Sequence, residues 1–215
     1  MPQDAVTLRR VARALNARLV GGKINKITQP VKDEIDMLVY AGGKTVQIVL
    51  SANASCARAG VSSLQRENPL VCYAFCMLLR KHLGGAFLVG VKQLGFERVA
   101  SLEFDARDEL GFPCKKYLIA EVMGKNSNLI FTDGDMKILA ALRTVDFTTS
   151  RLRQVLVGMK YELPPPQADK RDPRDESADG FAQAVNAASG ETTAAKFINS
   201  TYLGVAPVVA REIVT

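Results

Sequence analysis

Two short polar segments interrupt apolar runs and carry groups suited to binding an anion. Residues 123–128, MGKNSN, offer Gly, Lys, Asn and Ser groups that donate hydrogen bonds to phosphate or to base edges. Residues 95–99, GFERV, place Glu97 beside Arg98 between two expected strands. An arginine there can grip phosphate or stack on a base while the glutamate orients it. A plain turn at residues 123–128 and a surface ion pair at residues 97–98 are the alternatives.

The sequence shows no set of side chains typical of an enzyme. His82 is the one histidine, no Ser/His/Asp arrangement is evident, and no Gly-rich phosphate cradle follows a strand. Without CxxC spacing among the cysteines, we expect no metal and no other cofactor. The cysteines are Cys56, Cys72, Cys76 and Cys114, and we interpret Cys72 and Cys76 as buried residues of an apolar helix. A binding protein is therefore favoured over an enzyme.

The composition favours an anionic partner. Of 215 residues, 28 are Lys or Arg and 22 are Asp or Glu, which gives a net charge of +6. Nucleic acid is the commonest anionic partner of such a chain, and an ordinary basic protein is the alternative. The N-terminal sequence lacks the layout of an export signal, and no apolar run reaches the ~20 residues that cross a bilayer. We expect a cytoplasmic protein with no membrane partner.

The spacing of apolar residues predicts two helices that flank β-structure. Residues 4–19 repeat at helical spacing with Asp4 as the cap, and residues 24–50 contain a hairpin with a Gly-Gly turn. A second, mostly buried helix is predicted over residues 68–83, with Asn68 as its cap and Pro69 in its first turn. These elements must hold the two polar segments in place.

Short apolar runs then dominate the chain. In the run at residues 99–106, Ala100, Leu102 and Phe104 alternate with polar residues, which is typical of a half-exposed strand of an antiparallel sheet. The fold class expected is α+β, with an antiparallel sandwich or barrel-like sheet and flanking helices. Strands are predicted at residues 87–94, 99–106, 115–123, 128–132 and 136–145.

A change in composition predicts a domain boundary. Residues 167–178 mix proline with alternating charge, which is typical of a linker. Residues 1–166 are thus predicted as one domain, and residues 179–215 as the helical start of a truncated second domain. The break around Gly204 and Pro207 can present backbone amides to phosphate, although many structural helical hairpins share this pattern.

Several segments together resemble a known family. In order, they are NKITQPVKDEIDMLV, VLSANAS, ENPLVCYAFCMLLRKHLGG, GFERV, RDELG, EVMGKNSNLIFTD and YELPPP. Over residues 4–166 they are similar to the NFACT-N domain of the RqcH, or fibronectin-binding protein A-like, family. The segment FINSTYLGVAPVVAREIV resembles the opening of the helix-hairpin-helix domain that follows in this family. The resemblance implies a fold similar to the N-terminal domain of formamidopyrimidine glycosylases.

The resemblance also implies a function on the ribosome. Family members bind the large ribosomal subunit blocked by a peptidyl-tRNA, recruit alanyl-tRNA and extend the stalled chain with a C-terminal alanine tail. The peptide bonds would form on the ribosome, consistent with the missing catalytic set. The implied partners are tRNA, the large subunit with its peptidyl-tRNA, and the remaining domains of the full-length chain.

Family features can be carried over residue by residue. An acid near the N-terminus corresponds to Asp4, and an Asp-Arg pair corresponds to Glu97 and Arg98, with glutamate in place of aspartate. The acid before the polar loop corresponds to Glu121, and Asn126 stands where an imidazole is usual. The RNA-binding residues that we expect are Asp4, Glu97, Arg98, Glu121, Lys125, Asn126 and Ser127.

Two other functions compete with this one. A DNA glycosylase is suggested by the related fold and by Met1-Pro2, but such an enzyme needs an acid beside its proline, and Gln3 cannot transfer a proton. A surface adhesin for fibronectin is suggested by one family name, but the missing export signal argues against it.

Overall fold

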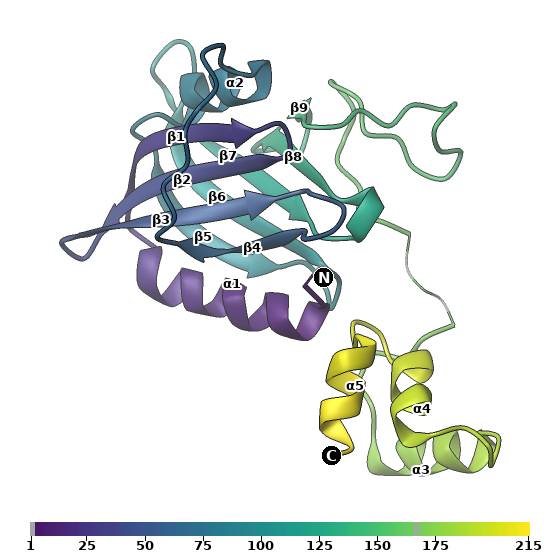
Figure 1. Ribbon diagram of the computed structural model, residues 1–215. Helices are drawn as coiled ribbons and strands as arrows, with labels where there is room; N and C mark the ends of the chain where they lie inside the picture. Colours follow the sequence, from purple (N-terminus) through teal and green to yellow (C-terminus); the bar gives the residue numbers. More distant parts are fainter. Residues whose placement is uncertain (1–2, 166, 168) are drawn as a thin grey trace.

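The computed structural model describes residues 3–165, 167 and 169–215. Figure 1 shows a sheet with α1 and α2 against it, and the helices α3, α4 and α5 near the C-terminus. Within the described part of the chain, no helix is long and apolar enough to cross a membrane. The strands are β1 (Lys23–Val31), β2 (Glu34–Ala41), β3 (Lys44–Ser51), β4 (Arg58–Ser62), β5 (Phe87–Gln93), β6 (Val99–Arg107), β7 (Pro113–Glu121), β8 (Asn128–Asp133) and β9 (Ile138–Ala141), and the α-helices are α1 (Ala5–Leu19), α2 (Ala74–Leu83), α3 (Ala178–Ala187), α4 (Ala194–Thr201) and α5 (Pro207–Ile213).

All the strands belong to one open antiparallel sheet. Its order is β4-β3-β2-β1-β5-β6-β7-β8-β9. The two halves are joined where β1 meets β5, at the pair Lys23 and Phe87, next to a hydrogen bond from Ile24 N to Ala86 O (2.8 Å). The predicted α+β class and antiparallel pairing are confirmed, and the expected sandwich takes the form of a single sheet with two halves.

The two halves of the sheet and both flanking helices share one hydrophobic core. Helix α1 contacts β2 and β4 in one half and β5 and β6 in the other. Its stripe of Leu8, Leu15 and Leu19 is buried in the same cluster as Ile48 of β3 and Phe104 of β6. Since each buried leucine contributes about 1.5–3 kcal/mol, this stripe fixes α1 against the sheet. The predicted helix over residues 4–19 is confirmed.

The second helix begins later than the sequence predicted. Helix α2 starts at Ala74, and Asn68 and Pro69 precede it in an irregular segment. Leu70 is fully exposed and Val71 is 82% exposed, so the expectation of a mostly buried helix is wrong for the first part of the segment. A residue that precedes proline is biased away from helical backbone, and neither apolar side chain has a partner that would favour a longer helix.

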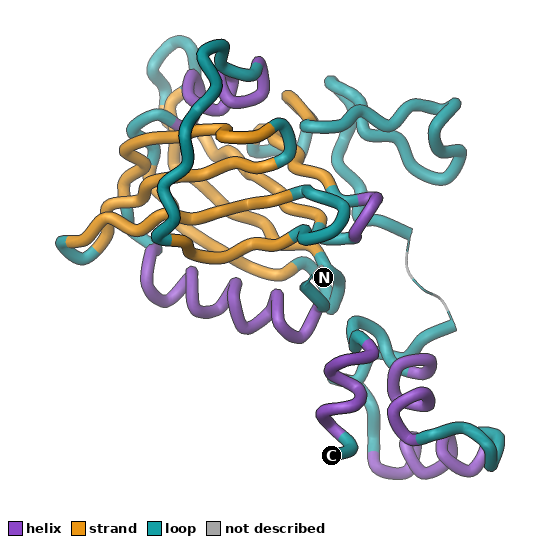
Figure 2. Tube along the Cα trace, in the orientation of Figure 1, coloured by secondary structure: helices purple, strands orange, loops and turns teal. Residues whose placement is uncertain are grey.

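Residues 63–73 instead form a strap across the outer face of β1–β3 (Figure 2). The Arg66 guanidinium lies 2.6 Å from the Glu34 carboxylate of β2. Nearby, Gln47 Nε2 of β3 donates to Leu64 O at 3.1 Å. These polar contacts hold the strap in an extended course, which competes with helix formation.

A second irregular segment covers the outer face of β6–β8. Val99, Ile119 and Ile130 point away from the main core and form a separate cluster with Val155 and Tyr161. The covering residues come from the long connection between β9 and α3, drawn as loop in Figure 2. As a result, this part of the sheet is buried on both faces. The alternation predicted for β6 is confirmed, because Leu102 and Phe104 lie in the main core. The expected exposure of its other face is wrong at Ser101, which is 2% exposed.

The C-terminal helices have a small core of their own. Phe197, Tyr202, Val205 and Ala210 are its buried residues. The described residues of the predicted linker pack with these helices, since Arg171 N donates to Thr201 O at 2.9 Å. Pro166 and Ala168, at the predicted boundary, lie outside the described residues.

The polar network beneath the strap generates a pH prediction. Asp36 on β2 is 6% exposed, and burial, reinforced by the Glu34 carboxylate and opposed by Arg66 and Arg58, raises its pKa to about 6. The folded state therefore binds the proton more tightly than the unfolded state. The resulting stabilisation is complete below about pH 4 and is lost as the pH rises through about 6.

We expect Asp36→Asn to raise the free energy of unfolding by about 1–2 kcal/mol near pH 7, because it removes a charge from a buried site. The gain should shrink near pH 4, where the native carboxyl group is protonated. Urea unfolding at the two pH values measures this difference. The matched control is Asp135→Asn in an exposed turn, which should show no such pH dependence; an equal gain at both pH values for Asp36→Asn would contradict the assignment.

Candidate nucleic-acid interface

The structure brings residues 95–99, residues 123–128 and the start of α1 to the same end of strands β5–β8. We call this end the edge of the sheet. The Gln93 side chain links two of them, since its Nε2 donates to Ala5 O (2.8 Å) and to Glu97 O (2.7 Å). Val122 N then donates to Arg98 O at 2.8 Å, which joins the β5–β6 turn to the end of β7. Hydrogen bonds to backbone groups therefore join the start of α1, the β5–β6 turn and the end of β7.

Asp4 is occupied by contacts within the chain. Its Oδ1 accepts from Thr7 N at 2.8 Å as the cap of α1, and its Oδ2 lies 3.4 Å from Ala206 N. The side chain is 6% exposed. Both carboxylate oxygens thus have backbone partners, which gives Asp4 a structural role at the junction between α1 and the C-terminal helices.

Glu97 and Arg98 lie half-buried in the β5–β6 turn. Burial, with a smaller contribution from Asp172, raises the pKa of Glu97, and the Arg98 guanidinium opposes that shift. Within the described part of the chain, Arg98 forms no salt bridge. Its donors are therefore available to an external acceptor such as phosphate.

Glu121 lies beneath this surface. It is 2% exposed, and Arg153 contacts both of its oxygens, at 2.5 and 3.2 Å. The Tyr161 hydroxyl donates to the same carboxylate at 3.0 Å, and burial together with Glu121 raises the pKa of this tyrosine. A direct RNA contact by Glu121 would require this group to open, so the structure gives Glu121 a positioning role.

The loop after β7 exposes two of its three predicted binding residues. Residues 124–126 form a 3₁₀ turn, on which Lys125 and Asn126 are exposed. Ser127 is 1% exposed, and its Oγ accepts from Met123 N at 2.8 Å. Lys125 and Asn126 can therefore reach a ligand, whereas Ser127 shapes the loop.

Arg143 holds this loop, and sequence reasoning missed it. Its Nη1 donates to Lys125 O (3.2 Å) and Ser127 O (3.3 Å), and its Nη2 donates to Ala52 O (3.2 Å). The loop after β3, which contains Ala52, is thereby connected to the loop after β7. No motif signals this role, because all three acceptors are backbone carbonyls whose positions depend on the fold.

The C-terminal helices approach the same edge of the sheet. Ala5 N donates to Gly204 O at 3.1 Å. Gly204 has a φ of +72°, and a Cβ on it would lie 2.6 Å from the Ala5 Cβ and 3.0 Å from the Phe96 ring. This glycine is therefore explained by close packing. The predicted alternative, a plain structural hairpin, accounts for the break around Gly204 and Pro207.

Comparison with known proteins supports the resemblance found in the sequence. A family model for the NFACT N-terminal and middle domains matches residues 4–215. The chain belongs to the NFACT family. It is 34% identical to the Rqc2 homolog RqcH of Bacillus subtilis over 215 residues, which cover all of this chain and 37% of that protein. The Rqc2 homolog RqcH of Streptococcus suis is 34% identical over 166 residues, 77% of this chain and 30% of that protein.

Solved structures show the same NFACT fold. The N-terminal domain of the fibronectin-binding protein PavA from Streptococcus pneumoniae matches with a TM-score of 0.87 and 27% identity, over 98% of this chain and 77% of that one. The N-terminal part of the fibronectin/fibrinogen-binding protein from Streptococcus suis matches with a TM-score of 0.86 and 30% identity, over 98% and 78%. The NFACT chain spans only about a third of the curated relatives described above.

The paired Glu121 carboxylate generates a stability prediction for this NFACT chain. We expect Glu121→Gln to lower the free energy of unfolding by about 3 kcal/mol, because Arg153 would keep a poorly exposed charge without its partner. The control is Glu103→Gln, which breaks the more exposed pair with Lys115 and should cost less than about 1 kcal/mol. Urea unfolding compares the two variants, and equal losses would refute a special role for Glu121.

Proposed function

We propose that this chain is the tRNA- and large-subunit-binding part of a ribosome-associated quality-control factor. Two curated relatives support the quality-control part of this proposal, because they are named as subunits of the ribosome quality control complex. The ribosome quality control complex subunit NEMF of Homo sapiens is 27% identical over 170 residues, 79% of this chain. The ribosome quality control complex subunit 2 of Schizosaccharomyces pombe is 34% identical over 106 residues, 49% of this chain. The proposal also includes a cytoplasmic location, where ribosomes work.

The observation that supports the proposal is that the candidate interface presents hydrogen-bond donors at its surface while two of its carboxylates are buried. Arg98, Lys125 and Asn126 offer donors at the edge of the sheet, whereas the Asp4 and Glu121 carboxylates are buried against partners. An approaching phosphate backbone therefore meets cations and amides, and of the predicted carboxylates only Glu97 is half-buried rather than buried. A net charge of +6 strengthens the long-range attraction.

The finer role proposed is recruitment of alanyl-tRNA for alanine tailing of a stalled chain. The chain would select and position tRNA while the ribosome forms the peptide bonds, so it would not itself be an enzyme. Glu97 stands where the family resemblance implies aspartate. Its extra methylene changes the reach of the carboxylate, and its half-buried position limits how far the side chain can adjust.

Two other functions have weaker support. The solved relatives are titled as fibronectin-binding proteins, and fractionation of native cells tests that function: an adhesin stays with the envelope, whereas a rescue factor sediments with large ribosomal subunits. The glycosylase alternative depends on Met1-Pro2, which lie outside the described residues. Gln3 is engaged by β4, since its amide exchanges 2.9 Å hydrogen bonds with the backbone of Ala59.

A salt-titrated binding assay tests the proposed function. The protein is titrated with alanine-accepting tRNA, with other tRNAs and with duplex DNA of similar length. Preference for the alanine tRNA would support selection by this part of the factor. Equal and steeply salt-dependent binding to all of these nucleic acids would show that a general basic surface accounts for the binding. That result would contradict selection of alanine tRNA.

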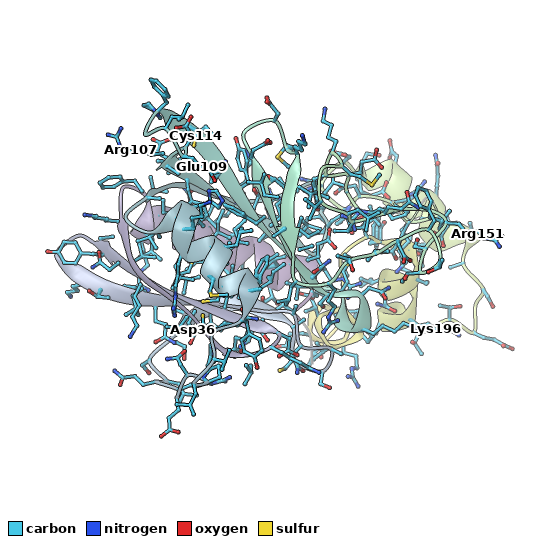
Figure 3. The ribbon with its side chains drawn as sticks, turned by 90° about the horizontal axis from the view of Figure 1, so that it is seen from above. Asp36, Arg107, Glu109, Cys114, Arg151 and Lys196 are labelled. Carbon is cyan, nitrogen blue, oxygen red and sulfur yellow. The ribbon has the colours of Figure 1, made fainter. Side chains whose placement is uncertain are left out.

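We expect Arg98→Ala to weaken tRNA binding by about tenfold or more, since phosphate or base contacts by arginine contribute about 1–3 kcal/mol. The thermal midpoint should stay close to that of the native protein. The matched control is Arg107→Ala at the other end of β6, where Figure 3 labels Arg107 beside Glu109 and Cys114. It removes the same charge and should leave tRNA affinity nearly unchanged. Native affinity in Arg98→Ala would refute this site.

A further inference from the structure

A second concave site lies beside the candidate interface, between α1 and β5. The cavity has a volume of about 410 Å³, within the range of about 300–1,000 Å³ typical of ligand sites. Arg9, Arg13 and Asn16 of α1 line one side, and Lys92 of β5 lines the other. Arg174, from the segment before α3, completes the wall. Side chains from three separate parts of the chain thus converge on one space.

The charge of this cavity is positive. Four of its lining side chains are cations and none is a carboxylate. Within the described part of the chain, Arg9, Arg13 and Lys92 take part in no salt bridge, whereas Arg174 pairs with Asp172 outside the lining. Asp172 offsets part of this charge through its pair with Arg174. The remaining cations repel one another, and an anion in the cavity would offset that repulsion.

Two of the guanidinium groups are held in place by the Phe96 ring. The Arg9 Cζ atom lies 5.9 Å from the ring centroid, and the Arg174 Cζ atom lies 5.2 Å from it. Phe96 itself is 8% exposed, so it is a fixed support. Cation–π contacts of this kind restrict the two arginines before a ligand arrives, which lowers the entropic cost of binding.

The cavity adjoins the surface proposed to bind tRNA. Gly95 belongs to its lining and lies two residues before Glu97 in the same β5–β6 turn. Asn16 Oδ1 accepts from Val91 N at 2.8 Å, which turns one end of the amide toward β5 and leaves its Nδ2 as a further donor. An extended RNA backbone that contacts Arg98 can therefore continue toward α1 and meet these donors.

We propose that this cavity is a second binding site for RNA backbone phosphate, completed by Arg174 from the C-terminal part of the chain. The inference rests on the proposed RNA-binding function and deepens it. Phosphate is the ligand because the lining offers several cationic hydrogen-bond donors and contains no carboxylate that would repel it. Since Arg174 closes the site, bound RNA would also hold the C-terminal helices against α1.

The test compares two charge-removing variants in a tRNA transcript binding assay at several salt concentrations. The first is Arg13→Gln combined with Lys92→Gln, and the second is Arg174→Gln. We expect the double variant to bind at least tenfold more weakly at low salt. Because each lost phosphate contact lowers the slope of log affinity against log salt by about 0.7–0.9, its slope should fall by about 1.4–1.8. Arg174→Gln should lower the slope by about half that amount.

The matched control is Arg18→Gln combined with Lys44→Gln. Arg18 lies on α1 outside this cavity and Lys44 is the first residue of β3, beside the β2–β3 turn. The control therefore removes two positive charges, as the test variant does. It should keep a slope close to that of the native protein. Equal losses in the control and the test variant would reduce the effect to net charge and overturn the site, as would native binding by the test variant.

Two further comparisons separate the sources of failure. If the native protein binds no tRNA, the proposed function fails; if Arg98→Ala weakens binding while the cavity variants bind like the native protein, only this inference fails. Inorganic phosphate is titrated at matched ionic strength while amide resonances of α1 and β5 are followed by NMR. Suppose that phosphate shifts these resonances in the native protein while the cavity variants keep native tRNA affinity. The cavity would then bind free phosphate, and the RNA assignment would be overturned. Native affinity in Arg174→Gln would remove the C-terminal part of the chain from the site.

Discussion

The arrangement of the candidate interface depends on the polar contacts around the first turn of α1. Asp4 accepts from Thr7 N and from Ala206 N, while Ala5 donates to Gly204 O and accepts from Gln93. Backbone groups at a helix start need such partners, because they lack partners within the helix. Gly204 O satisfies the Ala5 N–H, and the Gln93 amide of β5 adds a bond to the Ala5 carbonyl, so three parts of the chain are fixed relative to one another.

At this edge of the sheet, the Asp4 and Glu121 carboxylates are buried, whereas Arg98 and Lys125 lie nearer the surface. The carboxylates of Asp4 and Glu121 face inward, where backbone amides and Arg153 hold them. Cations such as Arg98 and Lys125 stay at the surface without salt-bridge partners in the described part of the chain. The buried acids stabilise the loops, and the half-buried Arg98 and the exposed Lys125 keep their donors for a polyanion. A single set of charged residues thereby serves both folding and binding.

The sequence predicted the elements better than it predicted the roles of the site residues. The cap at Asp4 and most of the predicted strands were correct, because local spacing determines them. The strand predicted at residues 136–145 is shorter, since β9 is Ile138–Ala141, and β4 was not predicted. The sequence placed Glu121 and Ser127 at a binding surface, where the structure shows them buried. The sequence also showed no sign of the Arg143 contact with Ala52 or of the Arg174 contact with Phe96, since each joins distant parts of the chain. The start of α2 was misplaced because contacts with β2 and β3 hold residues 63–73 in an extended strap.

The sequence by itself determined the α+β class, the helix at residues 4–19, the alternation of β6 and the family, because each is written in short-range patterns or in ordered motifs. Only the tertiary structure decided which polar residues reach the surface, how the C-terminal segment joins α1, and that Arg9 and Arg174 flank one aromatic ring. The physical reason is that burial and ion pairing depend on segments brought together by a shared core, and chain spacing does not encode those distances.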